Sequence, residues 1–84
     1  MANLWSGKIE DTGLYQNLET ATGLTFTEGN TYAIQIENGG AHIREGSTGR
    51  GFSVYDSKII SFTKSADDIY IEPMSDSCFV NIAG

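Results

Sequence analysis

The sequence predicts an all-β fold, a small antiparallel β-sandwich or barrel of about six to eight short strands. Apolar and polar residues alternate with a period of two in several short segments. Turn residues separate these segments at intervals of about 8–12 residues. No apolar stripe of helical period continues for three turns. At 84 residues the chain forms one domain with a small core.

The first thirteen residues carry the weakest pattern, and Thr12-Gly13 ends them with a turn signal. Residues 1–13 are therefore expected to form an N-terminal arm or an edge strand, followed by a single β domain over residues 14–84. Leu4 and Trp5 are the large apolar side chains of this segment. Two interpretations stay open: Trp5 covers one end of its own core, or the segment lies on another surface.

Residues 14–18 are compatible with a strand or with one turn of helix, and residues 20–23 break the pattern. Residues 24–27 alternate again and predict a strand, which the turn residues 28–30 close.

The clearest alternation lies in residues 31–37, where Tyr32, Ile34 and Ile36 form the apolar face. Asn38-Gly39-Gly40 follows, with residues that adopt positive φ angles at little steric cost. The alternation then resumes through residues 41–44. The sequence therefore predicts a β-hairpin over residues 31–44.

The second half of the chain repeats the strand-and-turn pattern. Residues 45–51 contain three glycines and predict a flexible loop. Pro73 cannot donate a ladder hydrogen bond, so it marks an edge or an exit from a strand. Further strands are expected at residues 52–55, 59–63, 69–72 and 78–82.

Charge and cysteine content exclude several classes of protein. The formal charge of −6 repels phosphate backbones, and no basic stripe is present, so we expect no nucleic-acid binding. No apolar run of membrane-spanning length occurs, and the first residues lack the basic and apolar regions of a signal peptide, so we expect no membrane partner and synthesis in a cytoplasm. The lone Cys78 cannot form an intramolecular disulfide.

No constellation of residues predicts catalysis or a cofactor. His42 is the only histidine and falls on the outward phase of its strand, where a solvated side chain is the ordinary case. Cys78 falls on an apolar phase and is expected to be an inert buried thiol. Four turn aspartates could gather at one end of a sandwich as a Ca²⁺ site, but their spacing lacks a regular rhythm. The four aspartates are Asp56, Asp67, Asp68 and Asp76. We therefore predict no catalytic residue, metal or cofactor.

Aromatic residues give the candidate partner contacts. Tyr55 and Tyr70 fall on the outward phase of their strands if Val54 and Ile69 point inward. Exposed tyrosines bind protein surfaces or stack on sugars, since the ring offers a large contact at small entropic cost. The candidate contacts are thus Leu4, Trp5, Tyr55 and Tyr70, with a subunit contact favoured over a glycan site.

One pattern of strand phase and turn residues spans most of the chain. It consists of Leu24, Phe26, Gly29, Tyr32, Ile34, Asn38-Gly39, Gly51-Phe52, Val54, Ile60, Phe62 and Ile69-Tyr70-Ile71. Over roughly residues 24–82, the chain resembles the small all-β structural proteins of tailed bacteriophages, including head decoration proteins and virion accessory proteins.

The resemblance implies a non-enzymatic component of a virion, made in the host cytoplasm, that docks on the particle exterior and stabilises it. It also implies a homo-oligomer, for which we favour a trimer, and a capsid or tail protein as partner. The alternative is a receptor- or glycan-binding β-module of a tail fibre or tail accessory protein, based on Tyr55 and Tyr70. A small hydrolase using His42 is the third hypothesis.

Overall fold

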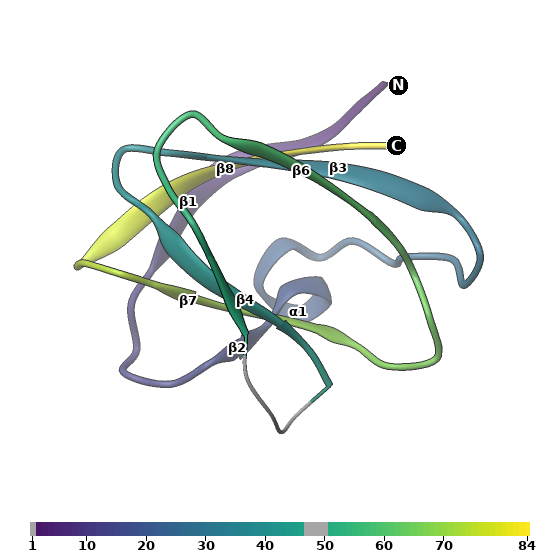
Figure 1. Ribbon diagram of the computed structural model, residues 1–84, viewed down its shortest axis with the longest axis horizontal. Helices are drawn as coiled ribbons and strands as arrows, with labels where there is room; N and C mark the ends of the chain where they lie inside the picture. Colours follow the sequence, from purple (N-terminus) through teal and green to yellow (C-terminus); the bar gives the residue numbers. More distant parts are fainter. Residues whose placement is uncertain (1, 47–50) are drawn as a thin grey trace.

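The computed structural model describes residues 2–46 and 51–84 (Figure 1). The residues 47–50 of the predicted glycine-rich loop lie outside the described part. The elements follow one another as β1 (Asn3–Glu10), β2 (Gln16–Asn17), α1 (Leu18–Thr22), β3 (Thr31–Glu37), β4 (Ala41–Glu45), β5 (Phe52–Val54), β6 (Ile59–Thr63), β7 (Ile69–Pro73) and β8 (Ser77–Ala83).

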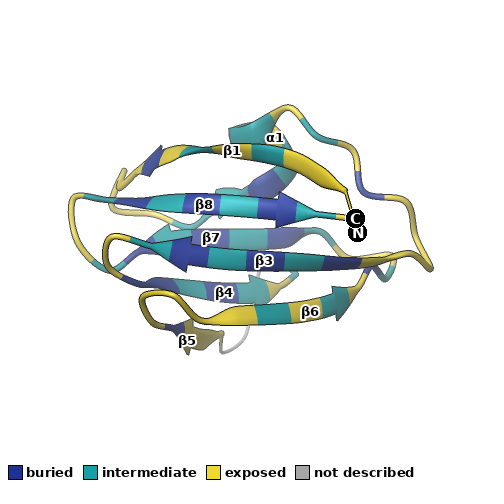
Figure 2. Cartoon of the chain, turned by 90° about the horizontal axis from the view of Figure 1, so that it is seen from above, coloured by how far each residue is buried: buried dark blue, intermediate teal, exposed yellow. Residues whose placement is uncertain are grey.

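Two four-stranded antiparallel sheets form the molecule, with strand orders β1-β8-β3-β6 and β2-β7-β4-β5. Figure 2 shows the first sheet in front, with β7, β4 and β5 behind it. The predicted all-β sandwich is confirmed. The two strand orders are those of an eight-stranded jelly roll, in which the chain crosses repeatedly between the sheets. Among the described strands, only β4 and β5 are consecutive in the chain and also pair with each other.

The core lies between the sheets and is filled by the alternate residues of each strand. In β3, Tyr32, Ile34 and Ile36 are buried while the residues between them are partly exposed or exposed. The same alternation appears in β7 and β8, as the striped colouring of Figure 2 shows. The period-two pattern in the sequence therefore predicts the two faces of β3, β7 and β8 correctly.

The predicted hairpin over residues 31–44 is wrong in its pairing, although both strands exist. β3 pairs with β6 and β8 in one sheet, whereas β4 pairs with β5 and β7 in the other. Asn38 and Gly39 adopt positive φ angles as expected, but they turn the chain across the sandwich. Two residues distant in the sequence bind this turn. The Asn38 N–H donates to Asp56 at 2.9 Å, and the Met74 N–H donates to the Gly40 carbonyl at 2.9 Å.

Residues 14–18, predicted as a strand or one turn of helix, contain the short strand β2, and the helix α1 begins only at Leu18 and continues through residues that were expected to break the pattern. The Asn17 side chain caps α1 by accepting from the backbone N–H groups of Glu19 and Thr20. Gly23 ends the helix in the left-handed conformation, with φ 78°.

The strand predicted at residues 24–27 is absent, because side chains take the hydrogen bonds that a ladder would need. The Phe26 N–H donates to Glu19 Oε2 at 2.7 Å, and the Thr27 N–H donates to the Tyr32 hydroxyl at 2.7 Å. Phe26 itself is buried and packs edge-on against Tyr32, with ring centroids 4.8 Å apart.

The N-terminal segment forms the edge strand β1, which pairs with β8 and has an irregularity between Asn3 and Trp5. The Trp5 ring packs against the core and lies over Gly7, where an added Cβ would come within 2.7 Å of it. Pro73, which was predicted to mark an edge or an exit from a strand, is the last residue of β7. Its nitrogen faces away from β4, toward a position beyond the end of the two-residue strand β2.

Truncating a core isoleucine should destabilise the protein far more than truncating an exposed one. Ile36 is fully buried, so Ile36→Ala should lower the free energy of unfolding by about 2–4 kcal/mol, through lost burial and a residual cavity. Ile59 is 64% exposed and provides the matched control. Urea unfolding of both variants measures the difference, and equal losses would contradict this assignment of the core.

Candidate functional site

The outer face of the β2-β7-β4-β5 sheet carries a stacked group of aromatic and cationic side chains. Arg44 of β4 and Tyr70 of β7 are register partners and point outward, because their neighbours Ile43 and Ile71 point into the core. The Arg44 guanidinium carbon lies 3.9 Å from the centroid of the Tyr15 ring and 5.9 Å from that of Tyr70. We call Tyr15, Arg44 and Tyr70 the tyrosine–arginine cluster.

Tyr15 reaches this cluster from the segment just before β2, at the edge of the sheet. Its hydroxyl lies 3.1 Å from the point where a Cβ would stand on Gly51, which precedes β5. The same Cβ position is 2.5 Å from the Ile43 carbonyl oxygen. Glycine at this position therefore lets the backbone and the Tyr15 ring approach each other across the sheet.

The electrostatics of the cluster are unusual for such an acidic chain. The sequence has eleven acidic residues, yet in residues 2–46 and 51–84 no carboxylate forms a salt bridge with Arg44. The Nε atom of Arg44 is buried without a hydrogen-bond partner. A guanidinium has a planar fork of donors that matches carboxylate and phosphate, and the flanking tyrosine rings offer stacking surfaces. The cluster thus has the chemistry to bind a small acidic ligand or an acidic sugar.

His42 lies beside the cluster in a row of side chains that crosses three strands. It pairs in register with Ser53 of β5 on one side and with Glu72 of β7 on the other. The His42 Nδ1 atom lies 3.1 Å from the Ser53 hydroxyl. Within the described residues, no hydrogen bond joins His42 to Glu72, so the carboxylate does not orient the ring as a catalytic triad requires.

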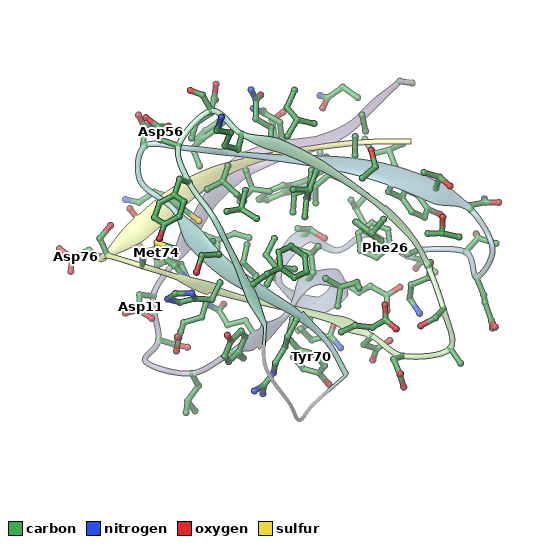
Figure 3. All side chains as sticks on the ribbon, in the orientation of Figure 1. Asp11, Phe26, Asp56, Tyr70, Met74 and Asp76 are labelled. Atoms are coloured by element: carbon green, nitrogen blue, oxygen red, sulfur yellow. The ribbon has the colours of Figure 1, made fainter. Side chains whose placement is uncertain are left out.

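The four predicted contact residues belong to three different parts of the surface. Leu4 is 42% exposed on the edge strand β1, where Trp5 turns partly into the core. Tyr55 is 63% exposed but lies in the turn after β5. Of the four, Tyr70 alone belongs to the cluster, and Figure 3 labels it on the lower side of the sandwich. Sequence reasoning placed Tyr70 outward but did not connect it with Tyr15 and Arg44.

The outer face of the other sheet carries a polar ladder centred on Asn81 of β8. The Ser6 hydroxyl donates to Asn81 Oδ1 at 2.7 Å, and Asn81 Nδ2 donates to Gln35 at 3.2 Å and to Glu37 at 3.1 Å. Beside this ladder, the small side chains of Ala33 and Ala83 leave a shallow groove of about 140 Å³. None of the residues that line this groove is titratable.

The turn aspartates do not gather at one end of the sandwich. Asp67 and Asp68 precede β7, whereas Asp76 follows it, so the length of that strand separates them. Figure 3 shows Asp56 and Asp76 at the end of the molecule opposite Phe26. Asp56 accepts the Asn38 N–H. Among the described residues, no group of three or more candidate ligands could hold a metal ion.

Cys78 is buried, with 1% of its surface exposed, and faces the core from β8. Desolvation penalises its thiolate and raises the pKa of this thiol to about 11. The thiol is therefore protonated and shielded at neutral pH, which disfavours a role as a nucleophile.

Comparison with known proteins gives no relative: no family model, curated protein or solved structure matches the chain. None of the helices in the described residues has the length and apolar character needed to span a bilayer.

Burial of Cys78 predicts a specific pH dependence of stability. The unfolded thiol releases its proton near the ordinary pKa of 9.0, whereas the native thiol holds it until about pH 11. The native state thus binds more protons between these values, and the stability contributed by Cys78 is lost as the pH rises through this window. Urea unfolding at several pH values should show a steeper loss for the wild type than for Cys78→Ala. Parallel curves would contradict the prediction.

Proposed function

We propose that the chain is a non-enzymatic structural protein of a phage virion, which docks on the outside of the capsid and stabilises it. The observation that carries this proposal is the jelly-roll strand order, since this architecture is common among viral capsid domains and among lectins. The architecture of the whole chain, rather than a particular binding site, therefore supports the proposal. It agrees with the resemblance of the strand and turn pattern to decoration and accessory proteins of tailed phages.

The surface of the molecule fits a docking role. Both sheets present an outer face of mostly polar side chains, and five large apolar residues are exposed among the described residues: Leu4, Leu14, Phe52, Tyr55 and Ile59. Each of these apolar side chains would contribute only a weak contact with a capsid. The total affinity becomes high when many linked copies bind one lattice, because each bound copy raises the effective concentration for the next contact. A homo-oligomer would multiply the contacts further and bridge neighbouring capsid or tail subunits.

The virion role is tested with a phage that encodes the chain and a derivative from which its gene is deleted. We expect the protein in purified wild-type particles at many copies, and deleted particles that assemble but release their DNA at a lower temperature. Adding the purified protein back should restore the wild-type release temperature. Absence of the protein from purified particles, or equal release temperatures of both particles, would contradict the proposal.

A second candidate function is recognition of an acidic glycan by the tyrosine–arginine cluster. The observation that favours it is Arg44, stacked on Tyr15, with its Nε atom unpaired and no carboxylate partner in the described residues. Lectins are also found among jelly rolls. In this role the guanidinium would bind a carboxylate of the sugar and a tyrosine ring would stack on its apolar face.

Glycan recognition is tested by titrating the protein with glucuronic acid, and with glucose as the neutral control, while following amide shifts by NMR. We expect the acidic sugar to shift residues around Arg44, and Tyr70→Ala to weaken binding by about tenfold, since a stacking contact contributes roughly 1–2 kcal/mol. Tyr55→Ala is the matched control because Tyr55 lies outside the cluster. Equal binding of both sugars would contradict acid recognition.

A further inference from the structure

Within residues 2–46 and 51–84, the strand β6 ends its sheet with one side unpaired. It pairs with β3 alone in the order β1-β8-β3-β6, and Figure 2 shows it at the margin of the molecule. The Lys64 N–H donates to the Asn30 carbonyl of the neighbouring chain segment at 2.9 Å. Because alternate residues of an antiparallel strand bond to the same neighbour, the even-numbered residues of β6 direct their backbone N–H and C=O groups toward β3. The N–H and C=O groups that point outward, away from β3, therefore belong to the exposed residues Ile59, Ser61 and Thr63.

β6 lacks the features that protect other edges of the sandwich. Edge strands usually carry charges, prolines or bulges, or are very short, because an open edge is a template for another strand. β1 has Lys8, Glu10 and a bulge near its start, while β2 has two residues and β5 has three. The five residues of β6 include no charge, proline or glycine.

The surroundings of β6 favour contact with another copy of this acidic chain. Three of the five exposed large apolar residues, Phe52, Tyr55 and Ile59, lie in the eight-residue segment that leads into this edge. Residues 51–64 contain one acidic residue, Asp56, against Lys58 and Lys64, while the whole chain carries a net charge of −6. Contact at this edge therefore brings little of the chain's negative charge together.

We propose that β6 pairs antiparallel with β6 of a second copy, about a two-fold axis at Ser61, and joins the two four-stranded sheets into one continuous sheet. In this register Ser61 faces Ser61 of the second copy, and Ile59 faces its Thr63. All three outward-facing residues of each strand then exchange backbone bonds, roughly six in total. The contact is isologous, so one edge serves both copies and the assembly closes as a dimer.

The register brings two lysines together at each end of the contact. Lys58 would face Lys64 of the second copy, and the Lys64 Nζ atom lies 4.0 Å from Asp68 of its own chain. The aspartate offsets the repulsion between the two lysines.

The pairing is tested by a cross-link at the axis. Register partners that exchange backbone bonds have Cα atoms about 5.5 Å apart, which suits a disulfide. Mild oxidation of Ser61→Cys should therefore give a covalent dimer at micromolar protein. Ser53→Cys, in the edge strand β5 of the other sheet, is the matched control and should cross-link only by slow random collision. The native Cys78 is buried and does not interfere. Equal rates for the two variants would overturn the proposal.

Sedimentation equilibrium of the full chain provides the independent measurement. We expect a reversible dimer, and Ser61→Asp should raise its dissociation constant by about tenfold or more, because two carboxylates then face each other at the axis. Ser53→Asp makes the same change of charge and should leave the constant unchanged, with circular dichroism confirming that both variants fold. A wild-type monomer at all concentrations, or an oligomer indifferent to Ser61→Asp, overturns the β6 contact. Neither result bears on the virion role, which is measured on particles.

Discussion

Burial of branched side chains between two sheets is the interaction on which the rest of the structure depends. The chain has one cysteine and therefore no internal disulfide, so apolar burial must offset most of the conformational entropy lost on folding. Ile34, Ile36, Ile71, Val80 and Ile82 are each at most 1% exposed and come from both sheets. Because strands that follow one another mostly lie in opposite sheets, neither sheet is made from one continuous stretch of the chain, and each depends on the other for its buried face.

That constraint explains which parts of the fold were predictable. Alternation within a strand depends only on which face is buried, so the β3 and β4 segments and the inward phase of Cys78 were placed correctly from sequence. Alternation within a strand does not determine which other strand it pairs with. Asn38-Gly39-Gly40 serves equally well for a hairpin or for a corner that crosses the sandwich, and the choice rests on Asp56 and Met74, which are distant in sequence.

Side-chain hydrogen bonding accounts for a second error. Residues 24–27 have the alternation of a strand, but the carboxylate of Glu19 and the hydroxyl of Tyr32 bind their N–H groups. The tyrosine–arginine cluster escaped prediction for a different reason, the unpredicted order of the strands. Arg44 and Tyr70 could be assigned to outward phases, but their meeting with Tyr15 requires that β2, β7 and β4 be adjacent, and a two-residue strand leaves little periodic signal. The sequence thus indicated that these residues lie on the surface, but it did not indicate that they contact one another.

The two ends of the described chain lie side by side, as Figure 1 shows, and are joined by reciprocal bonds: the Ala2 N–H donates to the Gly84 carbonyl at 3.1 Å, and the Gly84 N–H donates to the Ala2 carbonyl at 2.9 Å. A few added residues could therefore close the backbone into a ring without disturbing either sheet. New termini opened at an exposed turn would then yield a circular permutant, and cargo fused before residue 2 or after residue 84 would leave the molecule from the same side.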